Sequence, residues 1–173
     1  MPDLPLPRLA ACSIALLALG LATPASATWP HDPNTNLALC QASGDQLGTI
    51  GVSDGAGGAI FAWIDNRTGT GHLCAQRVSA SGTPLWTTDG VLLSTATGGE
   101  FSPAILADGA GGAIVAYQDV HGSFYDIYAQ RVNAVGVPQW TGKGVPLCAA
   151  TGDQWIQPMQ AIARALELSS CRR

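Results

Sequence analysis

The sequence predicts an all-β protein, and three observations carry that prediction. The chain repeats itself at a step of 54 residues, so the motif that begins at Asp54 returns at Asp108, and Trp86 returns as Trp140. Each repeat contains short apolar runs, and clusters of glycine, proline and aspartate separate them. Runs of this kind, with turn signals about every 8–12 residues, are typical of short antiparallel strands. We therefore expect each repeat to form one four-stranded meander.

The expected strands follow from the apolar runs of each repeat. Two complete units span residues 40–93 and 94–147, and residues 148–162 begin a third. In the second unit we expect strands over 103–107, 113–117, 127–132 and 145–148. Outside the complete units we expect a lone fourth strand at Leu37–Cys40 and a lone first strand at Ile156–Ile162.

The connections between these strands are predicted from turn residues. The glycine-rich cluster Asp108–Gly112 joins the first two strands, because glycine adopts the positive φ that tight turns need. A polar loop from Asp119 to Tyr125 joins the next two strands. Gly136 and Pro138 mark the turn that leads to the fourth strand.

Both faces of the inner strands are apolar, and this predicts a neighbouring sheet on each side. Side chains alternate between the two faces of a strand, so small and aromatic residues fall on opposite faces. A radial stack of four-stranded sheets buries both faces, so we expect the units to be blades of a β-propeller. Small residues on one face would let the next sheet approach closely, namely Ala62, Ala75, Ala116 and Ala129. Aromatic residues would fill the wider gap on the other face, namely Trp63, Tyr117 and Tyr128.

The repeat motif resembles that of a largely uncharacterised group of bacterial secreted proteins. The resemblance lies in Asp-Gly-x-Gly-Gly-Ala-Ile, then Asp-Ile-Tyr-Ala-Gln-Arg-Val, Gly, Trp, and Cys-x-Ala-x-Gly-x-Gln, over about residues 37–162. It implies β-propeller-like repeats and says nothing about activity. The first unit departs from the motif, since His72-Leu73-Cys74 stands in place of Asp-Ile-Tyr.

Two full units are fewer than the four to eight blades with which propellers typically close. We therefore expect an incomplete propeller, which is either a fragment of a longer one or a subunit that self-associates to complete a ring. Residues 163–173 break the repeat, and a shifted reading frame is compatible with the missing hairpin motif. We interpret them as an irregular tail that follows a frameshift.

The N-terminus predicts export. Residues 1–27 combine Arg8, an apolar run from Ala10 to Ala22 and the small residues Ala25-Ser26-Ala27, which is the pattern of a cleaved signal peptide. The run is too short for a membrane span, so we expect a secreted or periplasmic protein. In that oxidising space disulfides can form, and the sequence leaves open every pairing among Cys40, Cys74, Cys148 and Cys171. Small buried thiols are the alternative.

The charge pattern excludes some partners. The formal net charge is −4, and only 12% of residues are charged, without any basic patch. Nucleic acid and anionic membrane surfaces are therefore poor partners. Ligands at short, regular spacing for a structural metal are missing from the sequence, so we expect no cofactor.

Candidate ligand-binding residues cluster between the second and third strands of each unit. These weak candidates are Asp65, Arg67, Asp119, His121 and Asp126. Asp119 and Asp126 could flank a hydrolytic water or bind Ca²⁺ through their carboxylates. A solvated hairpin loop, with Asp65 and Asp119 capping a turn, is the favoured interpretation.

Other repeated polar and aromatic residues are assigned structural roles. Arg77 and Arg131 lie within apolar strands and need acidic partners, because an unpaired buried charge is very costly. Asp54 and Asp108 are the natural partners. Trp86 and Trp140 are expected to pack in equivalent environments, with sugar stacking as the alternative.

These features favour an exported, non-catalytic repeat protein that binds or scaffolds at the cell exterior, where its partner would be a protein, a glycan or its own kind. The alternative is a glycan-active hydrolase of sialidase-like architecture. Such enzymes resemble one another in a central arginine cluster with a Tyr/Glu pair, and this sequence lacks that cluster.

Overall fold

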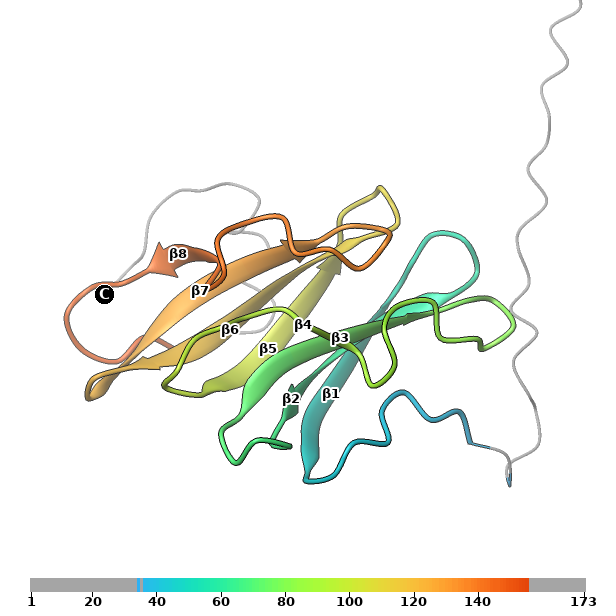
Figure 1. Cartoon of the computed structure of the whole chain (residues 1–173). Helices are drawn as coiled ribbons and strands as arrows, with labels where there is room; N and C mark the ends of the chain where they lie inside the picture. The colour runs from blue at the N-terminus through green and yellow to red at the C-terminus, as the bar shows by residue number, and fades with distance from the viewer. Residues whose placement is uncertain (1–33, 35, 156–173) are drawn as a thin grey trace, which may run out of the picture.

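The computed structural model describes residue 34 and residues 36–155, which form two four-stranded antiparallel sheets (Figure 1). Strand order in space follows strand order in sequence, so each sheet is a meander. This confirms the prediction of an all-β chain with one such sheet per repeat. Sheet 1 contains β1 (Gln46–Ser53), β2 (Ala59–Asp65), β3 (His72–Val78) and β4 (Val91–Leu92), and sheet 2 contains β5 (Glu100–Ala107), β6 (Ala113–His121), β7 (Phe124–Val132) and β8 (Val145–Cys148).

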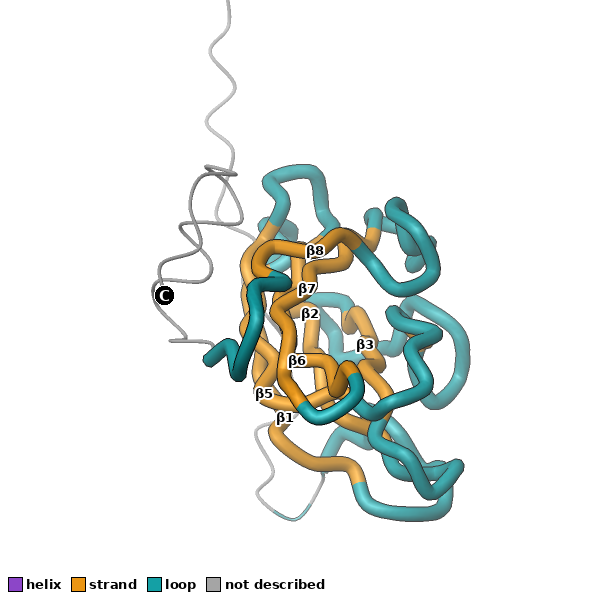
Figure 2. Tube along the Cα trace, turned by 90° about the vertical axis from the view of Figure 1, so that its left-hand side faces the viewer, coloured by secondary structure: helices purple, strands orange, loops and turns teal. Residues whose placement is uncertain are grey.

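The two sheets pack against each other as two layers (Figure 2). One apolar core joins the alanine-bearing face of sheet 1 to the aromatic face of sheet 2. Ala62 and Ala75 from sheet 1 are fully buried in this core, and Tyr117 and Tyr128 approach them from sheet 2. The alternation of small and aromatic residues in the sequence predicts this packing, because alanine lets the facing sheet bring its rings close.

The glycine-rich hairpins are tight because their last glycine lies against the neighbouring strand. A Cβ atom on Gly58 would lie 2.1 Å from the carbonyl oxygen of Val78, and one on Gly112 would lie 2.2 Å from that of Val132. Any side chain at these positions would push β3 or β7 away. The repeated glycine is therefore explained by close backbone approach.

Two sequence predictions about strand bounds are wrong, and three further predictions fall on residues outside the described part of the chain. Leu37–Cys40 is not a strand, and sheet 1 contains only strands that follow it. The predicted loop from Asp119 to Tyr125 is also wrong, because β6 extends to His121 and β7 begins at Phe124. The lone strand at 156–162, the signal peptide at 1–27 and the tail at 163–173 lie outside the described residues.

A β-bulge recurs at the start of both sheets. The pairing register shifts between Leu47 and Ile50 in sheet 1 and between Phe101 and Ala104 in sheet 2. Gly48 and Ser102 occupy equivalent places in these bulges, with φ of 65° and 49°. Positive φ is routine for glycine and uncommon for serine, so the shared bulge is set by the fold and not by glycine alone.

The described cysteines differ in state. Cys40 and Cys74 are free thiols, and burial raises the pKa of Cys74 to about 12. Cys74 is therefore the small buried residue that the sequence offers as one alternative. Cys148 is disulfide-bonded.

Candidate functional site

The glycine-rich hairpins carry the same ion pair in both sheets. Asp54 Oδ1 accepts hydrogen bonds from the backbone N–H groups of Ala56 and Gly58, both at 2.8 Å. Its other carboxylate oxygen lies 2.8 Å from an Arg77 guanidinium nitrogen. Sheet 2 repeats these contacts between Asp108 and Ala110, Gly112 and Arg131. The predicted pairing of these arginines is confirmed.

A buried glutamine holds the third strand of each sheet to the connection that follows it. Gln76 donates to the carbonyl of Thr87 at 2.9 Å and accepts from the backbone N–H of Trp86 at 2.9 Å. Gln130 makes the equivalent bonds with Thr141 and Trp140. This glutamine is not among the functional residues predicted from the sequence. Its recurrence beside the repeated arginine was the available signal.

The two repeated tryptophans occupy different surroundings beyond these backbone bonds. Trp86 is 9% exposed, and its Nε1 donates at 3.1 Å to the carbonyl of Ala134, in the turn that follows β7. Trp140 is half-buried, and no hydrogen bond from its Nε1 is found within the described part of the chain. The prediction of equivalent environments is wrong for the side chains, because among the described residues only Trp86 has a following sheet against it.

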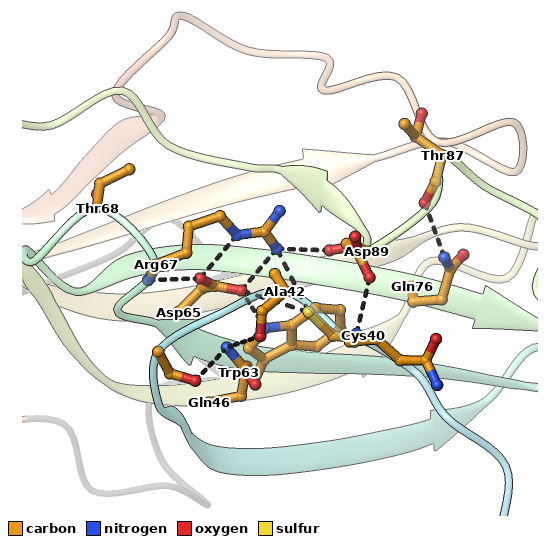
Figure 3. Close-up of polar contacts among 12 residues, drawn as sticks. Cys40, Ala42, Gln46, Trp63, Asp65, Arg67, Thr68, Gln76, Thr87 and Asp89 are labelled. Atoms are coloured by element: carbon orange, nitrogen blue, oxygen red, sulfur yellow. Dashed lines mark hydrogen bonds and ion pairs between the residues drawn. The ribbon is translucent and has the colours of Figure 1, made fainter.

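Asp65 and Arg67 form a clamp at the end of β2 (Figure 3). Asp65 is 1% exposed and accepts hydrogen bonds from Arg67 Nε at 2.8 Å, Arg67 Nη2 at 2.7 Å and Trp63 Nε1 at 3.1 Å. Arg67 also donates to the carbonyl of Asp89 at 2.7 Å, and Cys40 Sγ lies 3.7 Å from the Asp65 carboxylate. The clamp therefore ties the residues before β1 and the turn before β4 to the end of β2.

These contacts fix the charge of the clamp. Burial alone would raise the pKa of Asp65, but the hydrogen bonds from Arg67 and Trp63 outweigh it and hold that pKa well below its usual range. The hydrogen bond to Asp65 raises the pKa of the Arg67 guanidinium. Both groups are ionised at any physiological pH. Because the carboxylate already accepts five hydrogen bonds, it is poorly placed to take up an external ligand.

The acidic rung, defined as Glu100, Asp119 and Asp126, crosses sheet 2. Glu100 pairs with Asp119 across β5 and β6, and Asp119 pairs with Asp126 across β6 and β7. Directly paired residues share one face of a sheet, so three carboxyl groups lie in a row. Glu100 and Asp119 are 0% exposed. The corresponding rung of sheet 1 reads Gln46, Asp65 and His72.

One cation and two neutral donors offset this negative charge. Lys143 Nζ forms an ion pair with Asp119 and lies 4.6 Å from the centroid of the Tyr128 ring. Glu100 accepts from Ser94 Oγ at 2.6 Å and from the backbone N–H of Leu73 at 2.9 Å. The imidazole Nδ1 of His72 lies 3.4 Å from the Glu100 carboxylate. Glu100 thereby links sheet 2 to β3 of sheet 1.

Burial is the largest influence on Glu100 and raises its pKa. The hydrogen bonds from Ser94 and Leu73 and the nearby His72 act in the opposite direction, and Asp119 adds to the increase. Charged Glu100 is therefore less favourable in the folded protein than in the unfolded chain. Glu100 therefore makes a pH-sensitive contact between the sheets.

We expect Glu100→Gln to stabilise the protein at pH 7 by about 1 kcal/mol, because it removes one of two directly opposed like charges. Glutamine already occupies the equivalent positions 46 and 154. The gain should disappear as the pH falls through the raised pKa of Glu100 toward the unfolded-state value of about 4.3, where the glutamate is also neutral. Urea unfolding of both proteins across that range measures the effect.

Asp45→Asn is the matched control for this substitution. Asp45 is an exposed acid that precedes Gln46, the counterpart of Glu100. Its substitution should change the free energy of unfolding by less than about 0.5 kcal/mol. A Glu100→Gln variant that is less stable than the parent at pH 7 would contradict the unfavourable charge assigned to Glu100.

The predicted ligand-binding residues do not form one site. Asp65 and Arg67 belong to the clamp, whereas Asp119 and Asp126 belong to the acidic rung and lie in strands instead of a loop. His121 ends β6, and its side chain lies outside the described residues. The sequence did not predict which residues lie at or beside Asp119 in the acidic rung, because only the strand register brings them together. These residues are Glu100, His72, Ser94 and Lys143.

The described residues contain neither a metal-binding cluster nor a membrane-spanning helix. No group of three or more His, Cys, Asp or Glu side chains within residues 34 and 36–155 is arranged to hold a metal ion. The same residues contain no helix with the length and hydropathy of a membrane-spanning segment. Comparison of the chain with family models, with curated proteins and with solved structures gave no match.

Proposed function

We propose that this chain is an exported, non-catalytic repeat module that binds or scaffolds at the cell exterior. Its two sheets would act as neighbouring blades of a β-propeller-like assembly. The observation that carries the proposal is that the repeated polar residues are bonded within the fold. In both sheets the repeated Asp, Gln and Arg bond to one another or to the backbone, where they hold strands and turns together.

The burial of the acidic groups supports the same proposal. A glycosidase needs carboxyl groups that contact the sugar on both sides of the bond that breaks. Glu100 and Asp119 are fully buried between the sheets, and Asp65 is bonded to Arg67 and Trp63. These acids support the fold and are not available to a substrate in this geometry.

A recurring exposed apolar position supports a binding role. Leu47, Phe101 and Trp155 are equivalent in the repeat, and they are 55%, 44% and 68% exposed. Tyr125 connects the last two, because its ring lies 6.1 Å from that of Phe101 and 5.9 Å from that of Trp155. Phe101, Tyr125 and Trp155 therefore form a contiguous cluster, and exposed apolar clusters mark interaction sites.

Fluorogenic glycosides, including a sialoside, test the proposal against its hydrolase alternative. We expect the purified protein to release no more fluorophore than a heat-denatured sample. The matched variant is Asp119→Asn, which removes an acid that a hydrolase would need. Turnover by the parent protein that this variant loses would overturn the non-catalytic assignment.

A further inference from the structure

The aromatic cluster of Phe101, Tyr125 and Trp155 lies at one end of sheet 2. Phe101 pairs with Gln118 of β6, and Tyr125 pairs with Val120 of the same strand. Gln118 and Val120 are two residues apart, so their strand partners lie on the same face of the sheet. Trp155 follows β8, and its indole is the other neighbour of the Tyr125 ring. Residues far apart in the sequence thus bring three rings together.

Hydrogen bonds hold this cluster in place. The backbone N–H of Gln154 donates to the Tyr125 carbonyl at 2.8 Å, and Gln118 Nε2 donates to the Gln154 carbonyl at 2.7 Å. Asp153 Oδ1 accepts from the backbone N–H of Tyr125 at 3.3 Å. The segment 153–155 is therefore fastened to β6 and β7. A ligand would meet rings that are positioned before it binds, which lowers the entropy cost of binding.

The rings form a corner and not a flat platform. The planes of Phe101 and Tyr125 meet at 86° with their centroids 6.1 Å apart, and those of Tyr125 and Trp155 meet at 40°. Within this chain, Lys143 Nζ lies 4.6 Å from the centroid of the Tyr128 ring. Two perpendicular ring faces at that distance from one shared cation would have centroids about 6.5 Å apart. The separation of Phe101 and Tyr125 is close to this value, whereas a stacked sugar would need nearly parallel rings.

The corner is open, and its nearest charge is negative. Phe101, Trp155 and Asp153 are all exposed, although the same face of the sheet is buried further along, at Ala116 and Ala129. Among the described residues no Lys or Arg side chain lies over any of the three rings. Asp153 and the net charge of −4 both favour the approach of a cation.

We propose that the aromatic cluster binds the quaternary ammonium group of choline. Phe101, Tyr125 and Trp155 would supply the ring faces, and Asp153 would balance the positive charge. A quaternary ammonium group has no N–H to donate, and aromatic rings are its usual protein partners. The acid favours choline itself over phosphocholine and betaine, which carry an anion near the ammonium group. The proposal rests on the binding function proposed above and names its ligand.

Nuclear magnetic resonance titration of the purified protein with choline chloride, at constant ionic strength, tests this site. We expect binding in the millimolar range, with a shift of the Trp155 indole N–H signal and no shift of the Trp86 signal. The matched ligand is the uncharged tert-butyl analogue of choline, in which a carbon atom replaces the ammonium nitrogen. It should bind at least about tenfold more weakly, because it keeps the shape and loses the charge. Phosphocholine and betaine should bind about threefold more weakly than choline.

Three variants locate the site. Phe101→Leu removes one ring face and keeps an apolar side chain, as Leu47 has in the equivalent place of sheet 1, so it should weaken choline binding about fivefold. Asp153→Asn should weaken it about threefold. Leu47→Ala is the matched control and should leave binding unchanged, because sheet 1 has Gly71 where sheet 2 has Tyr125. Circular dichroism establishes that each variant is folded.

Three results would overturn the choline site. Choline could cause no shift at concentrations up to about 100 mM, or the uncharged analogue could bind as tightly as choline, which would leave an ordinary apolar patch. Leu47→Ala could also weaken binding as much as Phe101→Leu does. Glycoside turnover would contradict the non-catalytic function alone, so the two proposals fail by different measurements.

Discussion

Trp86→Ala should destabilise the protein by about 3–5 kcal/mol, the usual loss when a large buried side chain is truncated to alanine. The indole is 9% exposed, lies over Gly136 and donates to the Ala134 carbonyl. The substitution leaves a cavity at the contact between the sheets and removes one of the two donors to that carbonyl. Urea unfolding at pH 7, followed by far-ultraviolet circular dichroism, measures the loss.

Trp140→Ala is the matched control, since it removes the same side chain from the equivalent place in sheet 2. Trp140 is half-buried and makes no contact with a following sheet among the described residues. We expect less than half the loss seen for Trp86→Ala, measured at a concentration where the parent protein is monomeric. Equal losses for the two variants would show that Trp86 stabilises its own sheet and not the contact between sheets.

The sheets and their packing order could be predicted from the sequence because they depend on local patterns. The repeat step gives the units, the turn clusters give the hairpins, and period-two alternation puts Ala62 and Tyr117 on the faces that meet. The pairing of Asp54 with Arg77 was also predictable, because the hairpin between β1 and β2 brings Asp54 close to the end of β3.

The acidic rung could not be predicted, since it depends on register and strand length. The bulge near Ser102 decides which residue of β5 lies opposite Asp119, and the sequence does not reveal it. The polar character of residues 119–125 also predicts a loop, whereas β6 and β7 continue through them to His121 and Phe124. Burial of Asp119 follows from that extension, together with the ion pair from Lys143.

Asp65→Asn should destabilise the protein by about 3 kcal/mol at pH 7, because removing one partner of a buried ion pair leaves the other without compensation. The asparagine side chain cannot accept from all the donors that now bond to Asp65, so Trp63 Nε1 or an Arg67 nitrogen would lose its acceptor. The Arg67 side chain is 32% exposed, which lets water recover part of the loss. Urea unfolding gives the difference.

The pH dependence of that loss follows from the lowered pKa of Asp65. A carboxyl group whose pKa is depressed by folding contributes stability above its unfolded pKa, about 3.9, and loses it as the pH falls through the folded value. The deficit of Asp65→Asn should therefore stay constant from pH 7 to about pH 5 and shrink only in stronger acid. A deficit that disappears between pH 7 and pH 5 would contradict the assigned pKa.

Asp119→Asn supplies the matched comparison, because residue 119 is the repeat equivalent of residue 65. Asp119 loses its ion pair with Lys143 on substitution, but it also stops repelling Glu100 and Asp126 on either side. Like charges that face each other across a sheet are destabilising, so the two effects oppose. We expect a change of less than about 1 kcal/mol at pH 7. A loss as large as that of Asp65→Asn would mean that Lys143 outweighs the acidic rung, and the unfavourable charge assigned to that rung would have to be withdrawn.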